Sequence, residues 1–303
     1  MDNRLFSSKE VAEMLGVNES SVKRWADSHK IACIRTPGGH RKFKLSDLNE
    51  YIRANNIGSV LKLPDSKEFE NKKLSIGLQY KDHPVIIPHF FDLTMQADAS
   101  KIFGFINLLV LNKYTYIEFF DFILSPVLHQ IGENWATGQI SVDEEHAASS
   151  ALYEALIRIN TTIIKRPKRN LKAIIGVLEQ DLHELPAKCL SILLEIEGWQ
   201  IHYLGANTPI FSFEAALKKT GAQAILISSI IHPVESEKMV AGLKVLKQQL
   251  SEQNGVLIIG GPGLLGQFKQ LDFVDHWGLN YRETIQFLQT RFNKSGDVSI
   301  PVF

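Results

Sequence analysis

The stretch 171–197 limits the possible folds of this chain more than any other part of the sequence. It begins with an apolar run, 171–178, which contains β-branched residues and has the length of a buried parallel strand. Positions 187–197 then show apolar residues at near-helical spacing. The loop between them contains Asp181 and His183. Because ligands of doubly wound sheets bind outside the carboxyl ends of the strands, this order predicts that both side chains lie in a ligand-binding crevice.

Two further apolar runs end at the same edge of the predicted sheet. Residues 224–227 lead into Ser228, and residues 256–259 lead into Gly260 and Gly261. The carboxyl ends of parallel strands meet at one edge, so the three loops are expected to converge there.

The segment 168–303 is therefore predicted to be an α/β domain with a five-stranded parallel sheet of flavodoxin-like (Rossmann-like) order. The strands are expected near 171–178, 199–204, 223–228, 255–260 and 272–276. The run from Gly261 to Gly266 also matches the dinucleotide fingerprint. We reject dinucleotide binding because this run follows the fourth strand and no second mononucleotide-binding half follows it.

The order Asp-x-His, Ser and Gly-Gly resembles the cobalamin-binding domains of methionine synthase, mutases and corrinoid carrier proteins. The resemblance implies that His183 binds cobalt from below and displaces the dimethylbenzimidazole. It also implies that the nucleotide tail of the cofactor passes Ser228, Gly260 and Gly261. A metal-binding histidine usually donates its other ring N–H to a carboxylate, and Asp181 is placed for this role.

Two positions depart from the cobalamin-binding pattern. Pro186 stands where that family has glycine, and Ile230 stands where it has leucine. Proline is acceptable at the first position of a helix, although it stiffens the loop after His183. Taken from the residues alone, His183 can also be a core histidine or a general base.

The N-terminal segment 1–56 is predicted to be a winged helix-turn-helix domain. Ser7 and Glu10 form a capping box before a short helix that ends at Gly16, and Asn18 is expected to cap a second helix. Two short strands, 31–36 and 40–44, then surround a Pro-Gly-Gly turn. A third helix is expected to begin after Ser46 and end near Arg53.

Charge also favours DNA binding by this segment, although the whole chain has a formal net charge of zero. Residues 1–56 carry ten Lys or Arg against seven Asp or Glu, a balance of +3. The tryptophan of the second helix and the Gly-Gly-His-Arg-Lys-Phe wing resemble the DNA-binding domain of the MerR family. The alternative is a solvated basic surface. The candidate DNA contacts are Ser21, Lys23 and Arg24 on the second helix and His40, Arg41 and Lys42 in the wing, where Arg41 and Lys42 are expected to contact phosphates.

Between these two domains we predict a linker, 57–83, and a bundle of about four helices, 84–167. The linker is rich in charged and turn-forming residues with little periodicity. In the bundle, Ser141 and Glu144 form a second capping box, so a turn near 137–138 separates two antiparallel helices. Trp135 ends one of these helices and Glu145 and His146 begin the other, so the three are expected to meet at one end of the bundle.

This Trp and Glu-His arrangement resembles the signature of the adenosylcobalamin photoreceptor regulators, the CarH and LitR group within the MerR family. The resemblance implies that the bundle covers the upper face of the corrin. Trp135 would then pack against the adenosyl group, Glu145 would hydrogen-bond it and His146 would line the same pocket. Members that form a bis-histidine product after illumination carry a histidine where this chain has Ala136.

Three functions remain open from the sequence. The first is an adenosylcobalamin-dependent, light-responsive transcriptional repressor that binds operator DNA. The second is a corrinoid carrier or methyltransferase module, which has no use for a winged helix. The third is a regulator that keeps this scaffold without cobalamin, which Pro186 and Ala136 favour. We expect the first and expect no enzyme activity, because no Ser-His-Asp or Cys-His arrangement is visible.

The sequence also gives expectations for the location and the oligomeric state of the protein. No run reaches the roughly 20 apolar residues of a membrane-spanning helix, and the N-terminus lacks a signal-peptide apolar region, so we expect a cytoplasmic protein with no membrane partner. Residues 56–83 contain no heptads, so oligomerisation must involve the bundle and the cobalamin-binding domain. A dimer of dimers assembled by adenosylcobalamin is expected to bind DNA, since paired heads bind more tightly than one.

Overall fold

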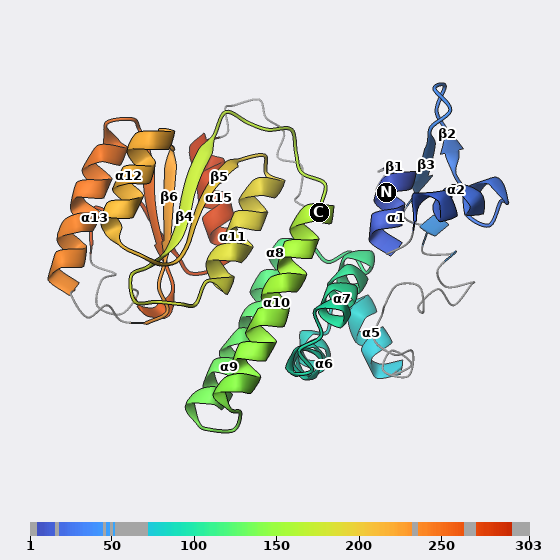
Figure 1. The fold of residues 1–303 in the computed structure, drawn as a ribbon, viewed down its shortest axis with the longest axis horizontal. Helices are drawn as coiled ribbons and strands as arrows, with labels where there is room; N and C mark the ends of the chain where they lie inside the picture. Colours follow the sequence, from blue (N-terminus) through green and yellow to red (C-terminus); the bar gives the residue numbers. More distant parts are fainter. Residues whose placement is uncertain are drawn as a thin grey trace. The chain divides into compact units, whose positions relative to one another are not determined.

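The computed structural model describes residues 5–15, 18–44, 47–48, 51, 72–231, 236–263 and 271–292. The chain forms two compact units that divide between Thr162 and Ile163. The first unit holds the N-terminal head and the helical bundle, and the second holds the α/β domain (Figure 1).

The head contains the two helices and the hairpin expected from the sequence, together with one additional strand. Its elements are β1 (Leu5–Ser7), α1 (Ser8–Leu15), α2 (Glu19–Asp27), β2 (Ile34–Arg35) and β3 (Arg41–Lys44). The strands form an antiparallel sheet in the order β1-β3-β2. The head has its own apolar core, which includes Val11, Val22, Ile31, Phe43 and Leu48.

Of the helix caps predicted in the head, the structure confirms the capping box and shows no side-chain cap at Asn18. The capping box is confirmed: the Ser7 Oγ accepts from the Glu10 N–H at 3.2 Å, and the Glu10 carboxylate accepts from the Ser7 N–H. Asn18 is the N-cap residue of α2, but its side chain makes no capping hydrogen bond, so that part of the prediction is wrong. Ser46 and the end of the third helix lie outside the described residues.

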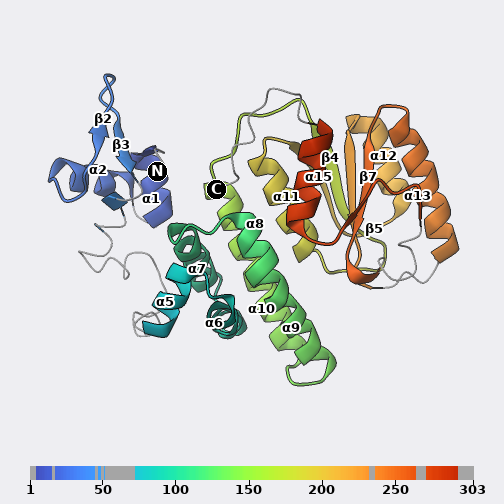
Figure 2. The ribbon, with the colours of Figure 1, turned by 180° about the vertical axis from the view of Figure 1, so that it is seen from behind.

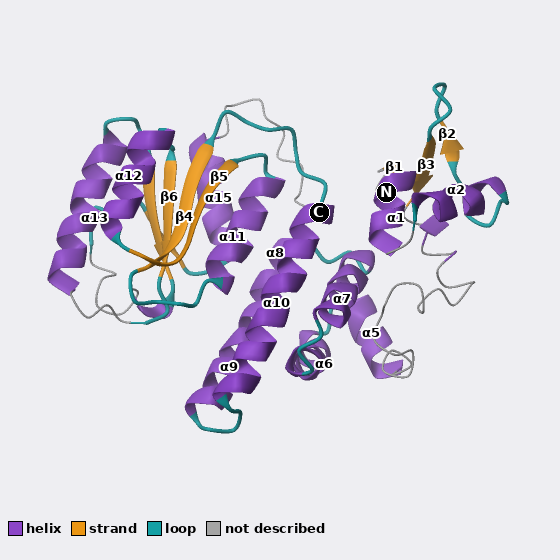
Figure 3. Ribbon diagram, viewed as in Figure 1, coloured by secondary structure: helices purple, strands orange, loops and turns teal. Residues whose placement is uncertain are grey.

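The helical bundle is confirmed, and Figure 3 shows its helices in purple. Its elements are α5 (Lys72–Tyr80), α6 (His83–Met95), α7 (Ala99–Leu111), α8 (Tyr116–Phe119), the π-helical turn η2 (Phe120–Leu124), α9 (Ser125–Ala136) and α10 (Val142–Thr162).

One expectation for this region was wrong. The linker predicted over 57–83 contains α5, because Leu74 and Leu78 are buried and Gly77 allows close packing on α6. A Cβ at Gly77 would lie 2.9 Å from Val85 Cγ1. Within the bundle, the Asp98 carboxylate accepts from two N–H groups at the start of α7 and caps that helix.

The α/β domain has the predicted flavodoxin-like sheet, with all strands parallel in the order β5-β4-β6-β7-β8. Its strands are β4 (Lys172–Leu178), β5 (Gln200–Thr208), β6 (Ala224–Ser228), β7 (Val256–Gly260) and β8 (His276–Gly278). The last strand was expected near 272–276 and lies later in the chain. The switch point lies between β4 and β6, because the chain continues from β4 to β5 on one side and later returns to β6 on the other.

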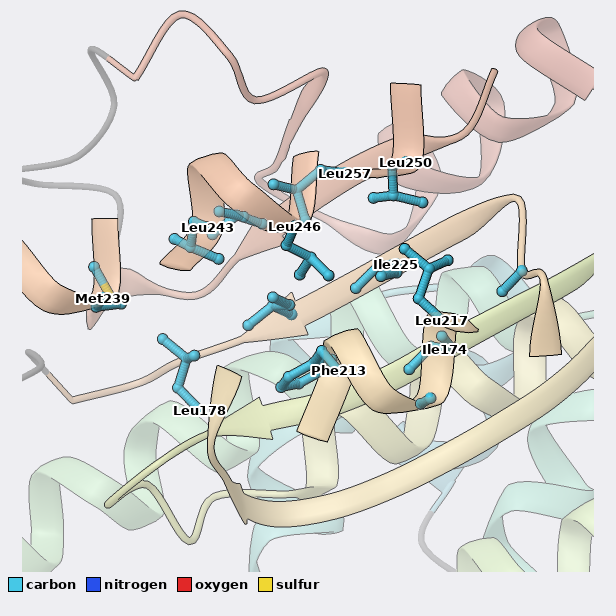
Figure 4. Packing of buried hydrophobic residues seen from close by; sticks show 14 residues of the cluster. Ile174, Leu178, Phe213, Leu217, Ile225, Met239, Leu243, Leu246, Leu250 and Leu257 are labelled. Carbon is cyan, nitrogen blue, oxygen red and sulfur yellow. The ribbon is translucent and has the colours of Figure 1, made fainter. Parts of the chain in front are cut away.

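Helices cover both faces of this sheet. They are α11 (Leu185–Ile196), α12 (Ile210–Thr220), α13 (Ser236–Ser251) and α15 (Tyr281–Phe292). Figure 2 shows α11 and α15 on one face and α12 and α13 on the other. Figure 4 shows the core on the α12 and α13 face, where Phe213, Leu243 and Leu257 are fully buried. Each such side chain stabilises the fold by about 1.5–3 kcal/mol. This core holds the strand ends in fixed positions.

Candidate functional site

Register brings three of the predicted loops to one edge of the sheet. Val177 pairs with Ser228, and Ser228 pairs with Gly260. The loops after β4, β6 and β7 therefore begin at the same level, as the sequence predicted. β4 and β6 lie on either side of the switch point, which is where open α/β sheets bind ligands.

Asp181 holds the loops at this edge of the sheet together through hydrogen bonds of its side chain, which is completely buried. Its Oδ1 accepts a hydrogen bond from the His183 N–H at 2.9 Å. Its Oδ2 accepts from the N–H of Ile230 at 2.5 Å and of Ile231 at 3.3 Å. The Ser229 hydroxyl donates to the same oxygen at 3.3 Å. The loop after β4 is thereby tied to the loop after β6.

The same carboxylate holds the imidazole of His183. Nδ1 of His183 lies 2.7 Å from Oδ1 of Asp181, and 55% of the His183 side chain is exposed. Nδ1 faces the carboxylate, so Nε2 is the ring nitrogen that does not face Asp181. This is the carboxylate–histidine arrangement that fixes the tautomer of metal-binding histidines and raises their basicity.

Electrostatics keep Asp181 charged. Burial opposes ionisation of its carboxyl, but hydrogen bonds from the His183 ring and from the N–H groups of His183, Ile230 and Ile231 outweigh it and lower the pKa. At neutral pH a negative charge therefore lies directly behind the imidazole, where it favours electron donation from Nε2.

Asn207 of β5 also holds the loop after β4, through hydrogen bonds that were not predicted from the sequence. The side-chain oxygen of Asn207 accepts from the Gln180 N–H at 2.8 Å, and the Asn207 N–H donates to the Asp181 carbonyl at 2.9 Å. The loop that follows β4 is thus fixed by both neighbouring strands. Leu182, between Asp181 and His183 in the sequence, is 73% exposed, so the same loop presents an apolar side chain to the surface.

Gly261 has a structural role in addition to the predicted contact with a nucleotide tail. Its φ is +98°, and a Cβ there would lie 2.2 Å from the Ser229 carbonyl oxygen. The space that the missing side chain leaves is therefore occupied by the loop that Asp181 holds. The contact of Gly260 and Gly261 with a cofactor stays a prediction.

Gly261→Ala is expected to destabilise the α/β domain by roughly 2–5 kcal/mol, since it combines a strained φ with a backbone clash. Thermal unfolding of the full chain measures this loss. The matched control is Gly132→Ala in α9, where a Cβ meets nothing within 4 Å and helix propensity should improve by about 0.5–1 kcal/mol. Equal melting temperatures for Gly261→Ala and the unsubstituted chain would contradict this assignment.

In the bundle, the turn between α9 and α10 carries the other candidate ligand contacts. The second capping box is confirmed, since Ser141 Oγ accepts from the Glu144 N–H at 3.4 Å and Glu144 accepts from the Ser141 N–H at 2.8 Å. Trp135 lies in the last turn of α9 and is 50% exposed, which is unusual for a tryptophan of a packed bundle.

Glu145 and His146 lie in the first turn of α10, at the end of the bundle that also holds Trp135. Glu145 accepts a hydrogen bond from the Ser149 hydroxyl at 2.5 Å, and its Oε2 lies 3.5 Å from His146 Nε2. The His146 side chain is exposed. The turn therefore presents an indole, a carboxylate and an imidazole, and their contacts with a cofactor stay predictions.

In the head, the candidate DNA contacts lie on α2 and on the hairpin. Lys23, Arg24 and His40 are exposed, whereas Ser21 and Lys42 are half-buried. Lys23 forms an ion pair with Glu19 at 2.8 Å.

Arg41 is held by Asp27, to which its Nε and Nη2 donate at 3.1 and 2.7 Å. The phosphate contact predicted for Arg41 therefore competes with an ion pair that the sequence did not predict.

Among the described residues, no group of three or more His, Cys, Asp or Glu side chains could hold a metal ion. A single histidine such as His183 is suited to a metal whose other ligands come from a macrocycle. In the same part of the chain, no helix is long and apolar enough to cross a membrane.

Family models match most parts of the chain. Residues 5–56 match the helix-turn-helix domain, residues 171–278 match the B12 binding domain, and residues 91–160 match a second B12 binding domain model. The chain therefore combines a helix-turn-helix domain with cobalamin-binding domains, which supports a cobalamin-binding, DNA-binding regulator.

Curated relatives are corrinoid proteins. The chain is 23% identical over 140 residues to dimethylamine corrinoid protein 3 of Methanosarcina acetivorans, which covers 46% of this chain and 65% of that protein. It is 21% identical over 139 residues to the trimethylamine corrinoid protein of Methanosarcina barkeri, which covers 45% and 64%. The chain thus spans slightly less than two thirds of the length of these relatives.

A solved structure has the same fold over the larger part of the chain. The monomethylamine corrinoid protein of Methanosarcina barkeri covers 68% of this chain and 97% of its own, with a TM-score of 0.54 and 18% sequence identity.

The site fits a cobalamin on its own geometry. An imidazole is held at 2.7 Å by a buried carboxylate, is more than half exposed and shares its loop with an exposed leucine at the switch point of the sheet. A planar, largely apolar macrocycle with one open metal position needs these features from a protein surface.

Proposed function

We propose that this chain is a cobalamin-dependent transcriptional repressor whose signal is light acting on adenosylcobalamin. One observation carries the proposal: a helix-turn-helix domain and a cobalamin-binding domain with an anchored histidine occur in the same chain. A DNA-binding head is useful on a cobalamin protein only if the state of the cofactor changes occupancy of DNA.

In this proposal His183 is the lower cobalt ligand and Asp181 fixes its ring. Ser228, Gly260 and Gly261 lie beside the nucleotide tail of the cofactor. Adenosylcobalamin, when bound, supplies a cobalt–carbon bond that light can cleave. The protein residues bind and orient the cofactor, and none has an enzymatic role.

The indole of Trp135 is proposed to contact the adenosyl group, with Glu145 as a hydrogen-bond acceptor and His146 beside it. The exposed fraction of Trp135 supports this role, because half of a large apolar side chain is available for a partner.

Trp135→Ala is expected to weaken adenosylcobalamin binding roughly 10-fold or more, because a buried aromatic contact is worth about 1–3 kcal/mol. Hydroxocobalamin, which has no adenosyl group, should bind almost unchanged. Equilibrium dialysis with both forms measures the difference. Equal losses with the two forms would remove Trp135 from the upper face of the cofactor.

The DNA proposal places α2 in the major groove, with Ser21, Lys23 and Arg24 as its contacts. The hairpin adds His40, Arg41 and Lys42, of which Arg41 and Lys42 would contact phosphates. We propose that such a protein acts in the cytoplasm and binds operator DNA as a homo-oligomer. The test is selection of duplexes from a random-sequence pool by the dark adenosylcobalamin form. Enrichment of a shared motif supports a regulator, and a pool that stays random after several rounds argues against one.

A second function, corrinoid carriage for a methyltransferase, is favoured by the relatives, which are named as methylamine corrinoid proteins. A carrier must present a methyl group to other enzymes and has no need for α2 or the hairpin. Deleting the head should leave methyl transfer to a partner unchanged if the chain is a carrier. If the chain without its head neither transfers a methyl group nor binds DNA, the regulator is favoured.

A further inference from the structure

One carboxylate joins the second helix of the head to both strands of the hairpin. Asp27 is the last residue of α2, while Arg35 and Arg41 are directly opposite each other in the β2–β3 register. Arg35 Nη2 donates to Asp27 Oδ1 at 2.7 Å. Arg41 Nη2 donates to both oxygens, at 2.7 and 2.8 Å, and Arg41 Nε also donates to Oδ1.

Helix stability does not explain an aspartate at this position. The carboxyl end of a helix carries partial negative charge, so an acidic side chain in the last turn is unfavourable. The two guanidinium groups reverse this effect, and the pKa of Asp27 is lowered chiefly by its hydrogen bond with Arg41. The ion pairs therefore account for Asp27 better than the helix does.

The ion pairs with Asp27 also affect how Arg35 and Arg41 of the hairpin can contact DNA phosphates. A guanidinium group contacts any phosphate regardless of sequence, so two unrestrained arginines would raise affinity for all DNA alike. Only 19% of the Arg41 side chain is exposed, while the Asp27 side chain keeps 45% of its surface in contact with solvent. Phosphates that approach this cluster meet a negative charge as well as two positive ones.

We propose that Asp27 is a positioning and specificity residue of the head: it fixes the hairpin against α2 and withholds Arg35 and Arg41 from indiscriminate phosphate contacts. This inference rests on the proposed DNA binding. Specificity is a difference between two affinities, and Asp27 increases it by lowering affinity for the wrong DNA.

The experiment compares Asp27→Ala with Glu19→Ala in the full chain. Both remove one carboxylate from α2, but Glu19 pairs with Lys23 and not with the hairpin. Each protein is titrated with one arbitrary 30-base-pair duplex across a salt series. Asp27→Ala should bind about 10-fold more tightly at ~0.1 M salt, with a salt slope steeper by about 1–2, and should enrich a less defined motif from a random pool. Equal changes in the two variants would overturn the proposal, because charge alone would then explain them.

A second readout does not need DNA. The hairpin tip is closed by hydrogen bonds from the Thr36 N–H to the His40 carbonyl at 2.9 Å and from the Gly39 N–H to the Thr36 carbonyl at 2.8 Å. Exchange of these amides should be several-fold faster in Asp27→Ala than in Glu19→Ala, and equal exchange would overturn the positioning role. If the unsubstituted chain binds no duplex, the proposed DNA binding and the specificity role fall together, while exchange still decides the positioning role.

Discussion

His183→Ala is expected to abolish retention of cobalamin. His183 is the proposed protein ligand to cobalt, and replacing a residue that only orients a metal ligand already costs about 10–100-fold in affinity. Loss of the ligand itself should therefore cost more than about 100-fold for adenosylcobalamin and hydroxocobalamin alike. Gel filtration of the loaded protein, with the visible spectrum recorded on the protein peak, measures the retained cofactor.

Two further variants make this result specific. Asp181→Asn keeps the shape of the buried side chain but removes its charge, and we expect a loss of about 10–100-fold. His129→Ala removes an exposed histidine of α9 that pairs with Glu133, and it should bind as the unsubstituted chain does. Full retention of cobalamin by His183→Ala would remove the imidazole from the cobalt.

The second large effect is expected on assembly. One winged head makes few DNA contacts, so tight binding requires at least two heads on one duplex. We expect the dark adenosylcobalamin form to be a dimer of dimers, and the apo and illuminated forms to be smaller and to bind DNA at least about 100-fold more weakly. Light scattering of the three forms gives the masses, and titration with a selected duplex gives the affinities.

A matched comparison separates assembly from cofactor binding. His183→Ala, supplied with the same adenosylcobalamin, should have the mass of the apo form. The same mass for apo, dark and illuminated protein would rule out ligand-driven assembly even if cobalamin were bound.

The candidate site was predictable where the position of a residue along a strand or loop decides which residues come together. Asp181 and His183 follow a buried strand, and the register of β4, β6 and β7 then brings their loop to Ser228 and Gly260. Ser229 was missed because it is one of two adjacent serines at a strand end, and only the fold shows which hydroxyl meets Asp181. The contact of Asn207 with Gln180 was not predicted because it spans 27 residues of sequence.

The other differences between the predictions and the structure also come from contacts between residues that are distant in the sequence. α5 was read as linker because Lys72, Lys73 and Gly77 obscure the spacing of Leu74 and Leu78, which are buried only because α6 packs against them. No local pattern indicates that Asp27 faces Arg41.

The central claim is that cobalamin controls DNA binding by this chain. The most direct test is to load the protein with adenosylcobalamin in the dark and to record its visible spectrum and its binding to a selected duplex before and after green light. We expect a bound-cobalamin spectrum that changes on illumination, together with release of the DNA. A protein that takes up no cobalamin, or that holds the duplex equally well before and after the spectrum changes, would contradict the claim.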